Sequence, residues 1–390
     1  MQNLITFEKA LKEHYLPAFR NQLNIEPSPI LSKIKKAPLR SNEIVGAAPI
    51  GLSGGFGFSS EGKSTPKAGG VMFERFKAYA KDMYVDIVIS AKAVRLTGSG
   101  GAMANALDTE VKGAYDTAKW NVGRALFGNG TGVLTTTSSV SASNQVTVAD
   151  TKYLKEGLIV DLYLTSAEVG STPTVAARRI TAVDRANKKI TLSGAAITAG
   201  AGFITVQNSY GVELTGIGAI FDDDIDDIYG VSKTSNPYLK PVVFDGEHDI
   251  SDGLITKALR AAKNEKNSQV DMLLCGDGAF DAYVEYLRTN NIRVEERSSQ
   301  LAGGFKSIKF IFGNKEVDIV NEQFVPDAEI WGIDSTAFKL YTQEWNFADL
   351  QGGGIFNLME NESLYRALLA NYGELMCENP GGCVRIYDCV

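Results

Sequence analysis

The sequence has few of the residue types that most often carry catalysis or hold metal ions. Among its 390 residues are two histidines, His14 and His248, and four cysteines. Cys377, Cys383 and Cys389 are each separated by five residues, which is not the spacing of a zinc site, and neither histidine lies near them in the sequence. We therefore expect buried structural thiols, with a disulfide as the lesser alternative, and neither a metal nor a cofactor.

Long apolar runs are also missing. No stretch of eighteen apolar residues occurs, so the sequence predicts no membrane span and no membrane partner. The first residues, MQNLITFEKALKEHYL, place charges among the apolar positions and lack the apolar core of a signal peptide. We expect the chain to remain in the cytoplasm in which it is made. An apolar content of 44% and 390 residues predict a globular protein with more than one substructure.

Charge is distributed unevenly along the chain. Residues 1–100 contain 14 Lys and Arg against 8 Asp and Glu, whereas the remainder contains 25 against 38. A basic leading segment joined to an acidic body can be complementary to a second copy of the same chain. It can equally be a solvated surface.

Two short matches to catalytic motifs lie in the glycine-rich segment GLSGGFGFSSEG. Residues 57–64, GFSSEGKS, match the phosphate-binding loop, and residues 51–55, GLSGG, match the nucleophile elbow of serine hydrolases. Both motifs work only between a strand and a helix. The preceding residues do not look like a strand, and Pro66, Gly69 and Gly70 oppose a helix. We therefore expect no nucleotide-dependent or hydrolytic activity, and a protein that is not an enzyme.

An acidic run lies just past the middle of the chain. It consists of Asp222, Asp223, Asp224, Asp226 and Asp227. Three of these occupy the first, third and fifth positions of a calcium loop, but Asp227 stands where that loop needs glycine and Lys233 where it needs glutamate. We expect a solvated acidic surface or an interface patch.

The N-terminal part predicts a helix followed by an extended arm. Residues 4–23 carry apolar side chains at helical spacing, interrupted by Pro17, which predicts a kinked amphipathic segment. Residues 24–45 contain three prolines and four basic residues, too much proline for a helix. A strand is predicted over 82–90 by strict alternation. The preceding FERFKAYAK is also compatible with a strand, and together they predict a long two-stranded loop with a glycine-rich end.

A long helix and two further regions follow. Residues 104–127 carry a continuous apolar stripe, with Asn105 and Asp108 placed like a capping box and Gly128 after the end. Short runs rich in Thr, Ser and Val between 132 and 214 predict a small antiparallel β module. From 249 onward, helices alternate with strands, including a hairpin around Gly313. The last residues, LMCENPGGCVRIYDC, predict a terminal hairpin.

This order of elements resembles the major capsid protein of tailed bacteriophages, which has the Hong Kong 97-type fold. The resemblance extends over essentially the whole chain. Its most specific stretches are LTGIGAI at 214–220, YGV at 229–231, NPYLKP at 236–241 and MLLCGDGAFDAYVEYL at 272–287. The implied fold class is α+β, with an N-terminal arm, an extended β-hairpin loop, a long spine helix, peripheral and axial domains, and an inserted small β domain.

The resemblance implies a division of the chain into seven parts. These are an N-terminal arm (1–45), an extended loop (46–96), the spine helix with the start of the peripheral domain (97–137), an inserted β domain (138–212), a peripheral return and link (213–248), an axial domain (249–335) and C-terminal peripheral and axial strands (336–390).

The resemblance also implies a function and partners. The chain would assemble in the bacterial host cytoplasm into hexamers and pentamers of an icosahedral virion capsid. This shell would enclose double-stranded DNA without sequence-specific recognition, and scaffolding, portal and possibly decoration proteins would be its partners. The alternatives are an encapsulin-like nanocompartment shell and an unrelated β-rich tail or surface-adhesion protein.

Charge suggests which residues would meet between subunits. We expect basic residues of the arm and loop to contact acidic surface of neighbouring copies, with the run at 222–227 a candidate. The basic set is Lys33, Lys35, Lys36, Arg75, Lys77 and Lys81.

Overall fold

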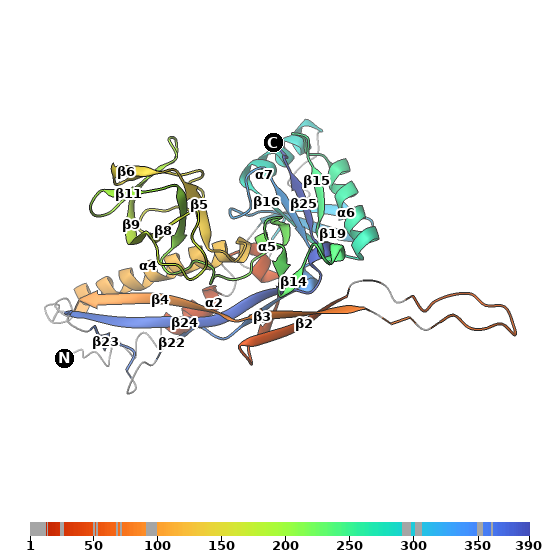
Figure 1. Ribbon diagram of the computed structural model, residues 1–390, viewed down its shortest axis with the longest axis horizontal. Coiled ribbons are helices and arrows are strands. Elements are labelled where there is room, and N and C mark those ends of the chain that lie inside the picture. Colours follow the sequence, from red (N-terminus) through yellow and green to blue (C-terminus); the bar gives the residue numbers. More distant parts are fainter. Residues whose placement is uncertain are drawn as a thin grey trace. The chain divides into compact units, whose positions relative to one another are not determined.

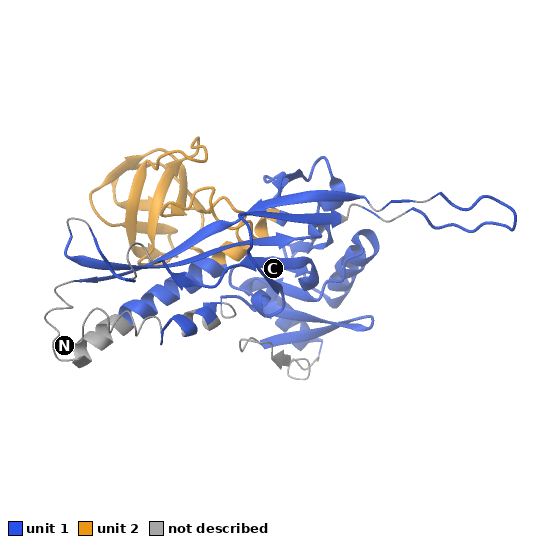
Figure 2. Ribbon diagram, turned by 90° about the horizontal axis from the view of Figure 1, so that it is seen from below, with its two compact units in different colours: residues 1–123, 220–390 blue, residues 124–219 orange. Residues whose placement is uncertain are grey.

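The computed structural model divides the chain into two compact units (Figure 2). Unit 1 comprises residues 1–123 and 220–390, and unit 2 comprises residues 124–219. The structure describes residues 13, 15–23, 27–49, 51, 54–67, 69–70, 72–90, 100–290, 298–300, 306–348, 354–359 and 362–390. His14 and residues 4–12 of the N-terminal helix expected at 4–23 lie outside these residues.

One sheet of unit 1 is organised around the long strand β24, Leu364–Cys377 (Figure 1). The strand β4, Lys81–Ser90, pairs antiparallel with it from Leu364 opposite Ser90 to Gly373 opposite Lys81. Its other partners are β21 (Phe338–Thr342), β22 (Asn346–Phe347) and β23 (Asn357–Leu358), and β1 (Lys35–Pro38) joins β21 in parallel. The strand predicted at 82–90 is thus confirmed.

The helix α4, Gly100–Phe127, packs its apolar stripe against this sheet. Val111 and Ala118 share one core cluster with Ile87 of β4 and with Leu369 of β24. The predicted helix, its end at Phe127 and its burial are confirmed. Its start was wrong: the helix begins at Gly100, ahead of the capping box expected at Asn105, because small residues can extend a helix beyond a local capping signal.

The N-terminal segment packs into unit 1 where a free arm was expected. The helix α2, Leu16–Leu23, follows π-helical residues at Glu13 and Tyr15, so the regular α-helix starts only one residue before Pro17. A 3₁₀ turn, η2, follows at Pro29–Ser32, and Ile30 is fully buried. Apolar residues between the prolines make residues 27–34 part of the core, whereas β1 is extended and mostly exposed, as the proline count indicated.

The glycine-rich segment is the tip of a hairpin between β2, Glu43–Pro49, and β3, Phe73–Tyr79. The two strands pair antiparallel from Glu43 opposite Tyr79 to Pro49 opposite Phe73. The expected pairing of 73–81 with 82–90 was therefore wrong, since β3 pairs with β2 and β4 pairs with β24. Alternation of side chains identifies the buried face of a strand but not its partner.

The second sheet of unit 1 runs in the order β15-β25-β20-β16-β19-β18-β17. Its strands are β15 (Val242–Asp245), β25 (Val384–Tyr387), β20 (Ile330–Ile333), β16 (Met272–Cys275), β19 (Lys315–Asn321), β18 (Lys306–Phe312) and β17 (Ser298–Gln300). The hairpin predicted around Gly313 is confirmed as β18 and β19. The predicted terminal hairpin was wrong, because β24 and β25 belong to different sheets.

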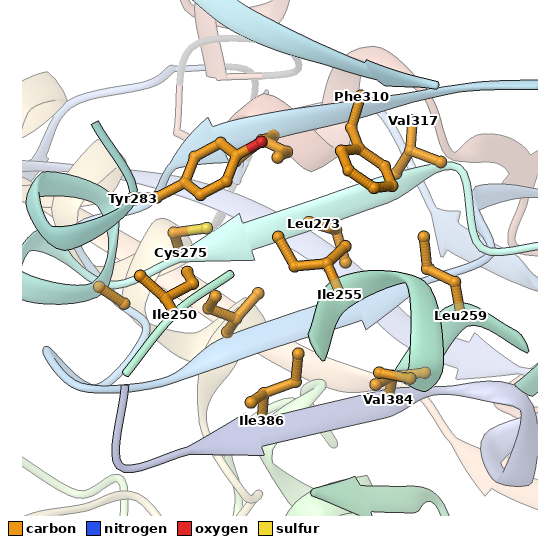
Figure 3. Packing of buried hydrophobic residues seen from close by; sticks show 14 of the residues in the cluster. Ile250, Ile255, Leu259, Leu273, Cys275, Tyr283, Phe310, Val317, Val384 and Ile386 are labelled. Carbon is orange, nitrogen blue, oxygen red and sulfur yellow. The ribbon is translucent and has the colours of Figure 1, made fainter. Parts of the chain in front are cut away.

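The helices α6, Asp252–Lys266, and α7, Asp277–Thr289, cover one face of this sheet. Figure 3 shows Ile255 and Leu259 of α6, Tyr283 of α7 and Leu273 of β16 in one apolar layer. Each helix starts with a carboxylate in its first turn, and Ser251 caps α6 by accepting from the backbone N–H of Leu254. Both helices and β16 were predicted from the sequence.

Unit 2 is a small β barrel. Its six-stranded sheet has the order β5-β12-β8-β9-β10-β7. The residues that follow β7 close the barrel by bonding to β5. Thr137 pairs with Val148, and the Ala149 N–H donates to the Thr136 carbonyl at 3.0 Å. Its strands are β5 (Val133–Thr137), β6 (Val140–Ser143), β7 (Gln145–Thr147), β8 (Ile159–Leu164), β9 (Val175–Asp184), β10 (Lys189–Leu192), β11 (Ile197–Ala199) and β12 (Gly202–Val206). The unit contains all of the β module expected between 138 and 212.

The remaining elements of the middle region are short. They are α5 (Gly218–Phe221), β13 (Asp227–Ile228), β14 (Val231–Ser232) and a 3₁₀ turn at Pro237–Leu239.

All four cysteines are free and buried, as expected, and burial raises the pKa of the Cys389 thiol to about 12. No helix in the described part of the chain is both long and apolar enough to cross a membrane.

Candidate assembly surfaces

The β2–β3 hairpin exposes basic side chains along β3. Alternation along β3 buries Phe76 and Ala78 and leaves Arg75 and Lys77 exposed. The Lys77 ammonium lies 3.7 Å from the Glu43 carboxylate on β2, and both side chains remain largely exposed. Lys81, at the start of β4, is half-buried. The two basic residues of β3 are thus placed where a second molecule can reach them.

The same hairpin exposes large apolar side chains that charge-based reasoning missed. Phe56 is 82% exposed and Phe58 is 95% exposed, and their rings contact each other edge to face with centroids 5.3 Å apart. Met72 and Phe73 are also mostly exposed at the base of the tip. Several exposed apolar residues on one element are typical of a surface that is covered by another molecule. In the sequence, the two phenylalanines inside a glycine- and serine-rich segment were the signal that could have predicted this apolar surface.

The acidic run mostly caps its own turns. Asp222 accepts from the N–H of Asp224, Asp226 from the N–H of Thr234, and Asp227 from the N–H of Gly230. Hydrogen bonds from Ser232 and Thr234 lower the pKa of Asp226. The carboxylates of Asp226 and Asp227 order the β13–β14 region, and all of the run except the half-buried Asp222 is exposed to solvent.

The lysines of the arm divide into two groups. Lys33 is paired inside its own chain, with its ammonium 2.5 Å from the Asp318 carboxylate and 3.7 Å from that of Asp271. Lys35 and Lys36 are exposed on β1. Contact between these lysines and a neighbouring copy stays a prediction. Because Lys33 is already paired within its own chain, Lys35 and Lys36 are the better candidates for that contact.

The environment of the two motif matches differs from that of a working phosphate loop or nucleophile elbow. A strand, β2, does precede the glycine-rich segment, although the sequence indicated none. Among the described residues, the next element is another strand, β3, and no helix N-terminus lies between β2 and β3. The phosphate-binding and nucleophile-elbow mechanisms both require that helix. In the described ranges, no three His, Cys, Asp or Glu side chains are grouped so that they could hold a metal ion.

Comparison with known proteins gives matches among solved structures only. No protein-family model matches the sequence, and no curated protein sequence matches it. The capsid asymmetric unit of cyanophage A-1(L) has a TM-score of 0.52 at 10% identity, with 92% of this chain and 90% of that chain covered. The capsid of an empty GTA particle has a TM-score of 0.48 at 8% identity, covering 94% and 91% of the two chains.

A third similar structure is the SrpI encapsulin complex from Synechococcus elongatus. Its TM-score is 0.46 at 8% identity, with 91% of this chain and 85% of that chain covered. Of these three structures, the cyanophage capsid has a TM-score above 0.5. At 10% identity the likeness to the cyanophage capsid concerns the fold, and it extends over nearly the full length of the two chains. The predicted α+β fold is confirmed: this chain has the Hong Kong 97-type fold of phage capsid proteins.

Proposed function

We propose that this chain is a major capsid protein, which assembles with copies of itself into an icosahedral shell around a double-stranded DNA phage genome. The observation that carries the proposal is the likeness to the cyanophage capsid over 92% of this chain. The exposed aromatic and basic residues of the β2–β3 hairpin support it, because a shell subunit needs surfaces that are satisfied only by neighbours.

The parts of the chain take the following roles in this proposal. The β2–β3 hairpin is the extended loop that lies across a neighbour, while β4, which the expected range 46–96 also included, belongs to the sheet of unit 1. The helix α4 is the spine helix, and residues 249–335 form the axial domain at the local symmetry axis. Residues 138–212 are an inserted β domain. Assembly takes place in the host cytoplasm, and scaffolding, portal and decoration proteins are the expected partners.

Electron microscopy of the purified protein tests the proposal directly. We expect closed shells or rings of five and six subunits in negative stain. Shells from phage-infected cells should contain nuclease-protected DNA. Particles filled with a protein cargo instead would assign the chain to the nanocompartment shells. A monodisperse monomer under all assembly conditions would contradict both.

Reversing the charges of the hairpin should impair closure of the shell. In the variant Arg75→Glu, Lys77→Glu, Lys81→Glu, we expect folded subunits or capsomers that fail to form complete particles. Each exposed ion pair contributes only about 0–1 kcal/mol, but the contacts repeat at every subunit of the shell. Sedimentation measures assembly, and circular dichroism verifies folding.

The matched control reverses three exposed basic residues of unit 2. Arg179 lies on β9, Lys188 in the turn after it and Lys189 on β10. Changing these three residues to Glu alters the net charge by the same amount as the hairpin variant does. We expect this control to assemble. Normal particles from the hairpin variant, with unchanged salt dependence, would disprove charge complementarity of the hairpin while leaving the capsid proposal intact.

A further inference from the structure

The two helices that cover the second sheet of unit 1 carry opposite charges on their exposed sides. On α6, Lys257, Arg260 and Lys263 are exposed and follow each other at a spacing of three residues, about one helical turn. On α7, the exposed residues of one stripe are Asp277, Asp281 and Glu285, at a spacing of four. We call these sets the basic stripe and the acidic stripe.

The charges of the two stripes are not satisfied within the described part of the chain. Arg260 and Lys263 make no ion pair there, and neither do Asp277 and Asp281. Glu285 reaches Arg288 only at 4.0 Å, with both side chains more than two-thirds exposed. The basic and acidic stripes therefore do not pair with each other in one subunit, although their helices belong to one layer.

The layer holds the two helices at fixed positions. Buried residues of both helices share one core cluster with Leu273 and Val317 of the sheet (Figure 3). The helix α6 contacts β15 and β25, whereas α7 contacts β16 and β19, so the helices cover different parts of the same face. Tyr283 of α7 donates to the Asp252 carboxylate at the start of α6 at 2.9 Å, which links the two helices directly.

We propose that the basic stripe of α6 in one subunit contacts the acidic stripe of α7 in the next subunit of the same capsomer ring. This inference rests on the proposed capsid function. A ring of identical subunits is closed by head-to-tail contacts, which require two different and mutually complementary patches on each chain. Opposite charges on two helices of one rigid layer meet that requirement, and the partner is a second copy of this chain.

Charge swaps test the contact with little disturbance of the fold. The first variant is Arg260→Glu with Lys263→Glu, and the second is Asp281→Lys with Glu285→Lys. Asp277 is left unchanged because a carboxylate in the first turn stabilises the helix, and Lys257 because its ammonium lies over the Phe244 ring. All four changed residues are exposed, and the unfavourable carboxylate that Lys263→Glu places in the last turn of α6 is a small cost, so both variants should fold, as circular dichroism can verify.

The decisive variant combines all four substitutions in one chain. It exchanges the signs of the two stripes and leaves the net charge unchanged. We expect each two-residue variant to lose capsomer rings at least tenfold relative to wild type in analytical ultracentrifugation, and the four-residue variant to recover most of them. The control, Lys188→Glu with Lys189→Glu in unit 2, matches the charge change of the first variant and should form rings normally.

The outcomes separate this inference from the capsid proposal. Wild-type rings together with normal rings from either two-residue variant would overturn the contact between the stripes, and the capsid proposal would stand. Failure of the folded four-residue variant to recover rings would overturn it as well. Absence of rings and shells in the wild type would instead contradict the capsid proposal.

Discussion

Replacing Val111 by aspartate should destabilise unit 1 by about 3–5 kcal/mol, because the change places an unpaired carboxylate in an apolar core. Val111 is 2% exposed and belongs to the cluster that joins α4 to β4 and β24. Domains are stable by about 5–15 kcal/mol, so this loss removes a large fraction of the total. We expect aggregated protein, or a greatly reduced urea midpoint for any protein that remains dispersed.

The control for this variant lies on the same helix. Thr117 is exposed, and its hydroxyl donates to the Gly113 carbonyl. Thr117→Asp introduces the same charge where water can solvate it, and we expect a change within about 1 kcal/mol. If Val111→Asp unfolds at the urea concentration of the wild type and assembles normally, the packing of α4 against the sheet is wrong.

Two glycines of α4 should respond in opposite directions when changed to alanine. At Gly123, a Cβ atom would lie 2.5 Å from the Phe324 ring and 2.9 Å from the Pro27 carbonyl oxygen. Phe324 cannot move away easily, because it is 1% exposed and packs edge to face on Trp120 with centroids 5.0 Å apart. Overpacking of this kind costs about 1–3 kcal/mol, so Gly123→Ala should destabilise the protein.

Gly113 provides the matched comparison. No heavy atom lies within 4 Å of a Cβ placed there, so Gly113→Ala should stabilise the helix by about 0.5–1 kcal/mol through its higher helix propensity. Urea unfolding of the unassembled protein measures both changes. Equal stabilisation by the two substitutions would mean that Pro27 and Phe324 do not approach the helix at Gly123.

Elements with a strong local pattern could be predicted from the sequence. The helix ending at Phe127, the strand at 82–90 and the hairpin around Gly313 each carry a periodicity or a turn signal that needs no distant partner. Their apolar faces are buried as the patterns indicate. The resemblance that identified the fold class needed more than these elements: it rested on the order of elements along the whole chain and on the stretches within 214–241 and at 272–287.

Strand partners could not be predicted in the same way. The residues ENPGGC signal a turn, and two strands flank it, yet β24 and β25 pair with strands far away in the sequence. Val384 of β25 is buried in the cluster under α6 and α7, and this burial rather than the turn determines its sheet. Alternation along a strand does not contain that information.

The candidate surfaces were predicted in part. Exposure of Arg75 and Lys77 follows from alternation around the buried Phe76. The pairing of Lys33 with Asp318 could not be foreseen, because the two residues are distant in sequence and meet only when the N-terminal segment packs beside β19. Desolvation opposes ionisation of Asp318, but hydrogen bonds from Lys309, Lys33 and Ser307 outweigh it, and the pKa of this carboxyl is lowered.

The six barrel strands of unit 2 form a sheet without an open end, since the pairing of Thr137 with Val148 joins its last strand to its first. An open edge strand offers unpaired N–H and C=O groups on which a strand of another molecule can be added. Subunits of the proposed shell would be held at a fixed spacing and would have a high effective concentration for one another, so that hazard would be greatest there. Closure of the barrel removes this hazard from its six strands, and we expect a peptide inserted in the turn between β9 and β10 to leave the barrel without a polymerising edge.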